Sequence, residues 1–524
     1  MSILRYTASL DNTITNAYEP TLTTRGTGSN MGGSDILEVF SIYGQSGSGG
    51  DSVELSRILM QFPIDKIKQD RDLGKLPTSG SVTFKLKLYN APHFQTVPEN
   101  FVLLISPVSA SWQEGTGVDM EDYKDLLLSN EGSNWLTASK GPNAWVKSGG
   151  DYHSSPTFTQ TFKTGLEDLN VDVSSLVEQW IKHETDGTTG APNNAKKNYG
   201  FGIRLTDAYE GYFSGSTDDE KSGSNGEANF QNESGATTSY YTKKFFGRTT
   251  SFFFKQPVLE AQYDNRVRDD RSNFYLSSSL LTKTEIMNNL YFYNYYRGKL
   301  RDIAGKTTAL PQLRLYYSSG SKPEGSRRGF LNSSLGVVHH VTASRVSRGI
   351  YKATIAASSS IINKTYPYLH DVWSYLGEQV LTGSVIIPKK YSPSVNSISE
   401  KYVLSMPNIK KDYHNKEVAR LRLYTRQKNW SPNVYSVVKK SPEYSVLPSA
   451  SYRVIRIVDD LEVVPYSYTD RKYSMLSHDI SGNYFDFDMS VLQKGYQYCF
   501  KFSIYDDYTN SYHEQPYRFK FRVI

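Results

Sequence analysis

The sequence has 524 residues, a length that favours three or four domains over a single hydrophobic core. Its net charge of +6 is spread without a long Lys/Arg stripe, which argues against a nucleic-acid-binding protein. One cysteine excludes an internal disulfide and a cysteine-based zinc site, and no run approaches the roughly 18 apolar residues of a membrane span.

Aromatic residues make up 13% of the chain and include 40 tyrosines, which can fill half-buried sheet faces. Cys499 lies in an aromatic strand pattern, so we expect a buried, inert thiol. The N-terminus lacks a basic segment followed by an apolar one, so no signal peptide is expected. Together with the missing disulfide framework, this predicts synthesis and assembly in a reducing cytoplasm.

Alternating apolar and polar residues in the first part of the chain are typical of short strands. They predict strands over residues 36–43, 56–64, 81–89, 101–108 and 199–205. Two further strands are expected over 249–254 and 257–263, and polar loops over 44–52 and 214–239.

Residues 111–180 contain four of the six tryptophans and two predicted helices. A helix over 172–182 would begin at Asp172, whose carboxylate can cap it. Its apolar stripe ends at Trp180, which we expect in the core. A second short helix is expected over 119–130 from apolar residues at roughly helical spacing.

The charged segment 264–271 and the Pro/Ser/Lys-rich segment 388–399 are predicted linkers. Strands between them are expected over 289–296, 312–317, 349–356 and 379–387. Strands after the second linker are expected over 418–426, 451–457, 483–489, 495–506 and 517–524.

Turn signals every few residues favour sandwiches over a parallel α/β fold. The predicted fold class is therefore all-β, with a sandwich and a short helix in residues 1–263 and Ig-like β-sandwiches in 264–390 and 400–524. Aromatic residues on both faces of strand 289–296 predict that a partner sheet or another subunit covers both sides.

The sequence holds no recognisable catalytic motif, such as HExxH, GxSxG or a Walker A loop, so we expect no enzyme and no cofactor. The acidic pairs at 459–460 and 506–507 are expected in turns, and 479–483 in a hairpin. Asp11, Asp35 and Glu38 could ligate calcium or could have plain turn and surface roles. No metal site is predicted.

Three tryptophans of residues 111–180 lie in or near predicted loops. Trp112, Trp135 and Trp145 could either stack on sugar rings or pack over the mouth of the sandwich. Trp112 and Trp145 are the candidate ligand-binding residues.

Several short motifs follow one another in the first half: SRILMQFPI at 56–64, WQEGTG at 112–117, GGD at 149–151, DVSSLVEQW at 172–180 and PVLEAQY at 257–263. In this order they resemble the DNRLRE-type, carbohydrate-binding-module-like jelly-roll domains. The resemblance implies a jelly roll over 1–263. Pro63 replaces the usual acidic residue, and the loops 119–141 and 207–249 are expanded, so no site residue is carried over.

The second half resembles domains of virion structural proteins of large tailed phages, through residues 473–479, 482–489, 495–496 and 516–523. This implies a neck, collar, tail or capsid accessory component of a virion, assembled in the host cytoplasm. Its expected partners are other virion proteins and copies of itself, with no nucleic acid and no membrane. The alternatives are a host-surface or glycan-binding module of a fibre or collar, and a polysaccharide-degrading enzyme with converging carboxylates.

Overall fold

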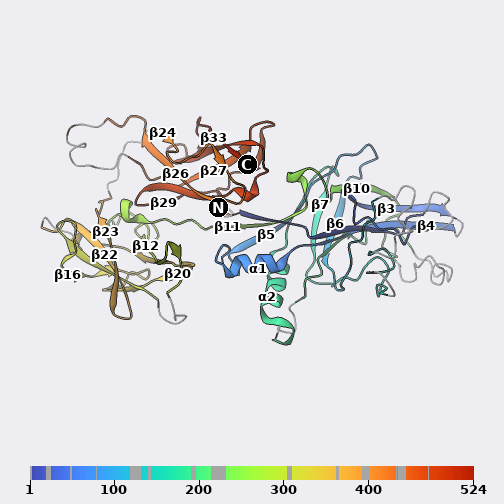
Figure 1. Ribbon diagram of the computed structural model, residues 1–524, viewed down its shortest axis with the longest axis horizontal. Coiled ribbons are helices and arrows are strands. Elements are labelled where there is room, and N and C mark those ends of the chain that lie inside the picture. The colour runs from blue at the N-terminus through green and yellow to red at the C-terminus, as the bar shows by residue number, and fades with distance from the viewer. Residues whose placement is uncertain are drawn as a thin grey trace. The chain divides into compact units, whose positions relative to one another are not determined.

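A computed structural model of the protein describes residues 3–18, 25–47, 50–77, 79–118, 132–139, 143–190, 196–213, 232–303, 310–361, 365–391, 401–431, 434, 444–469 and 471–524. The chain divides into two compact units, Ile3–Tyr263 and Asp264–Ile524, and β-strands are the main secondary structure of both (Figure 1). The predicted all-β fold class is confirmed.

The first unit is a sandwich of two antiparallel sheets. Its smaller sheet has the order β1 (Ile3–Thr7), β11 (Val258–Tyr263), β5 (Val82–Leu88), β8 (Leu169–Asp172). Its larger sheet has the order β10 (Tyr240–Phe246), β3 (Ile36–Gly47), β4 (Gly50–Gln61), β9 (Phe201–Leu205), β6 (Phe101–Pro107), β7 (Phe158–Phe162), with β2 (Leu10–Thr15) also paired to β4.

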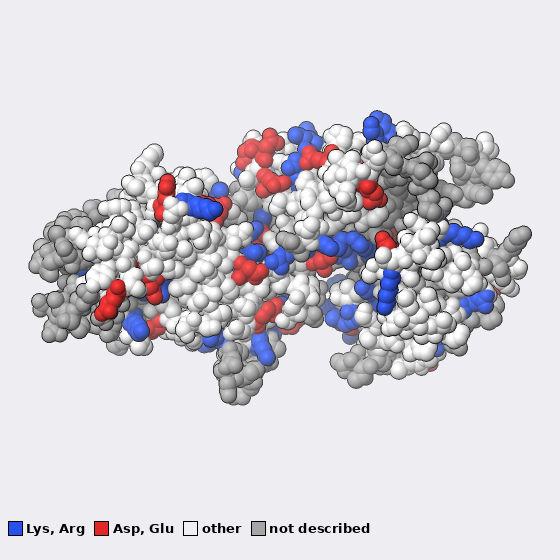
Figure 2. Space-filling model, turned by 180° about the vertical axis from the view of Figure 1, so that it is seen from behind, with Lys and Arg blue, Asp and Glu red and all other residues white. Residues whose placement is uncertain are grey.

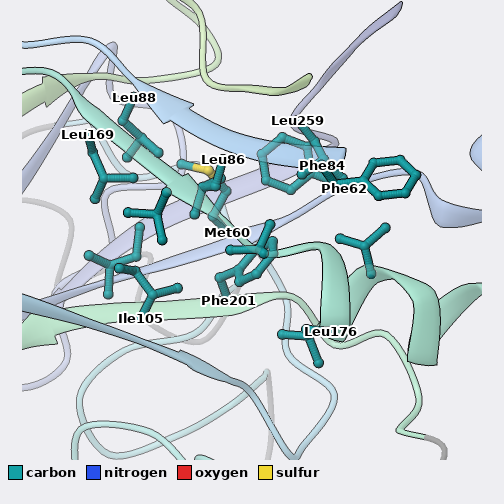
Figure 3. Packing of buried hydrophobic residues seen from close by; sticks show 14 of the residues in the cluster. Met60, Phe62, Phe84, Leu86, Leu88, Ile105, Leu169, Leu176, Phe201 and Leu259 are labelled. Carbon is teal, nitrogen blue, oxygen red and sulfur yellow. The ribbon is translucent and has the colours of Figure 1, made fainter. Parts of the chain in front are cut away.

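Alternate side chains of the two sheets meet in one apolar core (Figure 3). Phe84, Leu86 and Leu88 of β5 are fully buried, as are Met60 of β4 and Phe201 of β9. Alternation along each strand sends every second residue inward. The strand pattern predicted for 81–89 is thus confirmed, including its inward face.

Two helices close one side of this core. The α2 helix (Ser174–Gly190) begins two residues later than predicted and runs further, and the carboxylate of Asp172 accepts a hydrogen bond from the Ser174 backbone N–H (3.1 Å). Trp180 is fully buried, with its ring 4.8 Å from that of Phe201, which confirms its predicted place in the core.

The strand predicted over 56–64 is wrong at its end. β4 stops at Gln61, and Ile64 begins the α1 helix (Ile64–Asp72). Ile64 and Ile67 lie one helical turn apart and are both buried. The apolar residues of this short segment therefore fit a helix as well as an alternating strand. Arg71 of α1 holds Glu178 of α2 through two hydrogen bonds of 2.7 and 2.8 Å.

Two other local predictions are also wrong. The polar segment 44–52 is largely strand, because β3 and β4 continue to Gly47 and from Gly50 as a hairpin. Residues 249–254 form no strand and lead into a 3-10 turn, η2 (Phe253–Lys255), while the edge strand β10 was not predicted. The predicted helix 119–130 and most of the loop 214–239 lie outside the described residues.

The second unit contains two groups of sheets. Strands of the first group are β12 (Asn288–Tyr293), β13 (Tyr295–Tyr296), β14 (Lys299–Leu300), β15 (Gln312–Ser318), β16 (Glu324–Arg328), β17 (Phe330–Leu331), β18 (Val337–Val338), β19 (Val341–Thr342), β20 (Ser344–Ser347), β21 (Ile350–Ile355), β22 (Tyr368–Tyr375) and β23 (Glu378–Ile386). Its main sheets have the orders β12-β21-β20 and β16-β15-β22-β23.

Strands of the second group are β24 (Tyr402–Ser405), β25 (Asp412–Tyr413), β26 (Val418–Gln427), β27 (Ala450–Arg456), β28 (Leu461–Val464), β29 (Ser477–Asp479), β30 (Gly482–Asp488), β31 (Gln497–Asp506), β32 (Ser511–Glu514) and β33 (Phe519–Val523). They form sheets of order β24-β26-β30-β29 and β25-β33-β31-β27-β28. Between them, Tyr452 stacks on Phe485 with ring centres 4.4 Å apart, and Cys499 is buried and free as predicted.

Segment 264–271, predicted as a linker, is partly buried. Val267, Asp269 and Arg271 are each less than a tenth exposed. A short 3-10 turn, η3 (Asp270–Asn273), follows directly. Charge density alone suggested a linker, but the charges here are paired with other charges inside the second unit.

The burial of Trp180 gives a direct test of the first unit's core. We expect Trp180→Ala to lower the free energy of unfolding of the first unit by about 3–5 kcal/mol, because it leaves a cavity between α2 and β9. Calorimetry on the full chain measures the loss as a shift of the first unit's transition. Lys182→Ala, an exposed change on the same helix, should stay within about 0.5 kcal/mol of the original.

Candidate functional site

The tryptophans singled out as candidate ligand-binding residues lie inside the first unit. Trp112 is 5% exposed, Trp145 is 6% exposed, and both pack in an apolar cluster with Trp135, beside the main core. The indole N–H of Trp112 donates to the Tyr199 carbonyl, and that of Trp145 to the Asn134 carbonyl, each at 2.8 Å. Neither ring presents an open face for a sugar, so ligand binding by Trp112 and Trp145 stays a prediction without an exposed platform.

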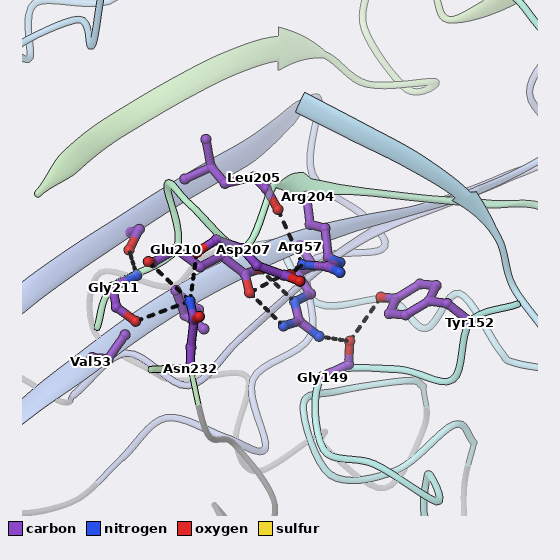
Figure 4. Close-up of polar contacts among 12 residues, drawn as sticks. Val53, Arg57, Gly149, Tyr152, Arg204, Leu205, Asp207, Glu210, Gly211 and Asn232 are labelled. Carbon is purple, nitrogen blue, oxygen red and sulfur yellow. Dashed lines mark hydrogen bonds and ion pairs between the residues drawn. The ribbon is translucent and has the colours of Figure 1, made fainter. Parts of the chain in front are cut away.

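A buried polar cluster lies next to these tryptophans (Figure 4). Arg57 of β4 makes two hydrogen bonds to the Glu210 carboxylate, at 3.1 and 3.0 Å, and a third to the Gly149 carbonyl at 3.0 Å. Its guanidinium lies 5.1 Å from the centre of the Trp135 ring. Arg204 of β9 reaches the same Glu210 at 3.3 Å.

The GGD motif at 149–151 has its explanation in this cluster. Gly149 adopts a φ of +85°, and a Cβ there would lie 2.8 Å from both the Arg57 guanidinium and the Trp135 ring. Only glycine therefore lets the arginine and the indole approach the turn so closely. The Arg57 guanidinium bonds both to Glu210 and to the Gly149 carbonyl, so the cluster ties the loop to the sheet.

A second acidic cluster lies at Asp11, whose side chain is 1% exposed. One carboxylate oxygen accepts the Arg248 backbone N–H at 2.5 Å, and the other is buried with no hydrogen-bond partner among the described residues. Arg248 is held by Glu114 at 2.9 Å, and the Asp11 backbone N–H donates to Glu114 at 2.9 Å. Burial, with Glu114 adding to it, raises the pKa of Asp11 to about 7.

Asp11, Asp35 and Glu38, the residues that could ligate calcium, do not form a common ligand set. Asp35 is exposed, and Glu38 is paired with Lys244 at 2.7 Å. Within the ranges given above, no three His, Cys, Asp or Glu side chains are grouped to hold a metal ion.

Other acidic residues singled out in the sequence lie in turns, as expected. Asp459 pairs with Arg456 at 2.5 Å, and Asp460 follows it at a φ of +51°. The predicted hairpin at 479–483 joins β29 to β30, with Gly482 at a φ of +105°. These carboxylates serve turns and ion pairs.

The two groups of sheets in the second unit are joined by segment 264–271 and β29. The His478 backbone N–H donates to the Val267 carbonyl at 2.9 Å, and the Asp269 N–H donates back to the His478 carbonyl at 3.0 Å. The His478 ring lies 3.1 Å from the Asp270 carboxylate.

Arg271 follows this joint and is buried in an ion network. It bonds to Asp269 and Asp371, and its guanidinium also donates to the Tyr291 carbonyl at 2.7 Å. The indole of Trp373 donates to the same Asp371 at 2.7 Å. Removing one partner of such a buried ion pair strongly lowers stability, because it leaves the other charge buried without compensation.

Strand β12 was expected to be covered on both faces, and its middle is. Phe292 faces the Trp373 ring, 5.6 Å away, whereas Tyr291 lies in a small cluster with Val267 and Tyr484. The second group of sheets within the same unit therefore provides the cover. Beyond β12, Tyr295 is exposed.

The hairpin of β22 and β23 carries several exposed apolar side chains. We call it the apolar arm, residues 376–385. Leu376 at its turn is 70% exposed, and along β23 Val380 is 47%, Leu381 37% and Val385 37% exposed. β23 is the outer strand of its sheet, and it carries no charge after Glu378.

Lys/Arg and Asp/Glu are interspersed across the face shown in Figure 2. In the described chain, no helix has the length and apolarity to cross a membrane.

Comparisons with known proteins leave the chain without an assigned family. No protein-family model matches it, and no curated protein sequence matches it. Among solved structures, it aligns with native Escherichia coli alpha-2-macroglobulin at 8% identity and a TM-score of 0.16, covering 93% of this chain and 20% of that one. Salmonella alpha-2-macroglobulin reacted with methylamine gives 8% identity and a TM-score of 0.14, covering 98% and 28%. The chain thus spans under a third of these proteins, and such scores carry no argument.

Sequence reasoning missed the polar centre of the first unit. Arg57 occupies a position in an alternating strand that predicts an outward-facing side chain. Glu210 lies in a segment that was predicted to be an expanded loop. The nearest signal was the GGD turn, whose glycine the cluster requires.

The Arg57–Glu210 pair predicts a large stability effect. We expect Arg57→Met to lower the free energy of unfolding by about 3 kcal/mol, because Glu210 loses its bidentate partner while buried. Urea denaturation of the full chain measures it. The double variant Arg57→Met/Glu210→Gln should recover part of the lost free energy of unfolding. If the two variants lose equal amounts, the unpaired charge of Glu210 is not the cause.

Asp11 predicts a pH dependence. Its folded-state pKa of about 7 lies above the ordinary value of 3.8, so its contribution favours folding at acid pH and is lost as pH rises through about 7. Asp11→Asn should flatten that decline in the first unit's melting temperature between those pH values. Calorimetry across this range is the measurement, and an unchanged slope in Asp11→Asn would assign the decline to another group.

Proposed function

We propose that this protein is a structural component of a tailed-phage virion, acting through assembly contacts with copies of itself and with other virion proteins. The observation that carries the proposal is the apolar arm. The virion setting comes from the resemblance of the C-terminal sandwich to phage structural domains. The chemistry of the arm supports the assembly role independently of that resemblance.

An exposed outer strand is usually protected against pairing with other chains. Natural proteins place lysines, prolines or inward-pointing charges on such strands. β23 has no lysine, proline or charged residue from Gln379 to Ile386, and Val380 and Leu381 are both exposed to solvent. Two irregularities interrupt its pairing with β22, one of them at Val380. An outer strand with exposed apolar side chains suits addition of a strand from another subunit.

The state of the polar residues supports the same proposal. The buried acids Glu210, Glu260 and Asp371 are each bonded to arginine or lysine. Arrangements of this kind stabilise a rigid module and leave its surfaces for contact. The glycan-binding alternative has no comparable observation, since Trp112 and Trp145 are buried.

Charged substitutions in the apolar arm test the proposal. Leu376→Lys and Val380→Lys should weaken self-association of the purified chain, or its incorporation into particles, by about tenfold or more, a factor that corresponds to about 1.4 kcal/mol. Light scattering with size-exclusion chromatography measures the first, and immunogold electron microscopy of purified particles the second.

The matched control is Val458→Lys, which changes an equally apolar and 72% exposed residue in a turn between β27 and β28. It should behave as the unaltered chain does, and all three variants should keep the original melting temperature. Equal assembly of the arm variants and the control, or absence of the chain from purified particles, would overturn the proposal.

A further inference from the structure

Lys243 is the one lysine among the fully buried large side chains of the described chain, with a 1% exposed side chain in the edge strand β10. Its ammonium nitrogen lies 5.3 Å from the Phe162 ring centre and 4.8 Å from that of Phe245. Lysine is almost never fully buried without a specific partner. Its surroundings therefore require an explanation that the assembly role does not supply.

Three oxygens surround the Lys243 nitrogen. They are the side-chain amide oxygen of Asn90 at 2.5 Å, the Gly165 carbonyl at 2.7 Å and the Glu167 carbonyl at 2.9 Å. The contact to Asn90 is the shortest and lies below the usual range for an N–H···O hydrogen bond. It places the lysine nitrogen next to a carboxamide carbon, the carbon that an amine can attack.

The neighbouring chain fixes both reaction partners. Residues 89–91 pair with β10, through a bridge from Asn90 to Phe245 and a hydrogen bond from the Ala91 N–H to the Lys244 carbonyl (3.1 Å). The Asp168 carboxylate accepts the Asn90 backbone N–H at 2.7 Å. Asp168 is therefore a positioning residue for Asn90, and it places a carboxylate near the amine.

Gly165 shapes the turn that supplies one of the oxygens. It has a φ of +74°, and a Cβ there would come within 2.1 Å of the Pro98 carbonyl. Glycine therefore lets this turn pass close to Pro98, and two carbonyls of the turn, Gly165 and Glu167, accept hydrogen bonds from Lys243. Burial lowers the pKa of Lys243 to about 8, so a neutral, nucleophilic amine is accessible in mildly alkaline solution.

We propose that Lys243 and Asn90 form an intramolecular isopeptide bond. The Lys243 nitrogen attacks the side-chain carbonyl carbon of Asn90, a C–N bond forms, and the bond from that carbon to the Asn90 amide nitrogen breaks. One proton passes from the lysine nitrogen to the departing nitrogen, which leaves as ammonia. No oxidant, reductant or cofactor is required, and the proposal does not depend on the virion assignment.

The bond would tie the segment that follows β5 covalently to strand β10, with which it already pairs. Asn90 follows β5 in the smaller sheet, and Lys243 lies in β10 of the larger one. The residues are 153 positions apart, so the bond would close a long loop of the unfolded chain, as a disulfide does. A protein with a single cysteine has no disulfide with which to make such a tie.

Mass spectrometry of the full chain tests the proposal. The purified chain is incubated at about pH 6 and about pH 9, on either side of the lysine pKa of about 8, then denatured and weighed. We expect a mass below that of the sequence by one ammonia, reached sooner at the higher pH. A tryptic digest should contain one branched peptide joining the segments of Asn90 and Lys243.

Variants separate the bond from other routes of ammonia loss. Lys243→Met and Asn90→Ser should keep the full calculated mass, whereas Lys244→Met, at the adjacent residue paired with Glu38, should still lose ammonia. Asp168→Asn should slow the loss. Asn90→Ser should also lower the melting temperature of the first unit by about 10 °C, from the lost cross-link.

Two results would overturn the proposal. One is a full calculated mass for the unaltered chain at both pH values, which would leave Lys243 as a non-covalent clamp. The other is ammonia loss without a branched peptide, which would indicate cyclisation of Asn90 on its own backbone. Because the unaltered chain decides both, the test stands even if Lys243→Met fails to fold.

Discussion

Burial of alternate side chains between facing sheets is the constraint on which this structure depends. A strand can place only every second residue inside, so each sandwich needs two sheets whose inward faces match. In the first unit β5, β4 and β9 meet this condition with aliphatic and aromatic residues. In the last sandwich aromatic rings dominate, as in the stack of Tyr452 on Phe485. Many of the buried charged residues are paired with an opposite charge, as Glu210 is with Arg57.

Two buried carboxylates of the described chain illustrate this pairing. Glu210 is held by two arginines, and Asp371 is held by Arg271 and an indole. These carboxylates hold loops and strands in place. Asp11 and Lys243 differ, because burial moves the pKa of each toward neutrality and neither has a single opposite charge that fully offsets it.

The fold was predictable wherever one strong pattern decided the local structure. Val82 to Leu88 alternate cleanly, and the Asp172 cap with the stripe ending at Trp180 marked α2. Prediction failed where two patterns competed. Ile64 fits both an alternating strand and the first turn of a helix, and only its packing with Ile67 decides for α1. The charge of segment 264–271 predicted a linker but gave no sign that Arg271 is buried against Asp371, a carboxylate distant in sequence.

The candidate sites were less predictable, since they depend on residues far apart in the chain. Lys243 and Asn90 are 153 positions apart, and neither belongs to a motif. The tryptophans drew attention as possible sugar platforms because ring exposure cannot be read from sequence. The exposed residues of β23 were predicted as strand, but nothing local indicated that the strand would lie at an edge.

The backbone bonds between segment 264–271 and β29 have a mechanical consequence. The contact is a parallel bridge from Arg268 to His478, and its bonds at Val267 and Asp269 lie side by side along the chain. A load pulling the two strands lengthwise would strain these bonds together, in shear, whereas a load peeling them apart would break them one at a time. The second unit should therefore resist tension along this direction more strongly than tension across it, a directional stiffness set by two or three residues.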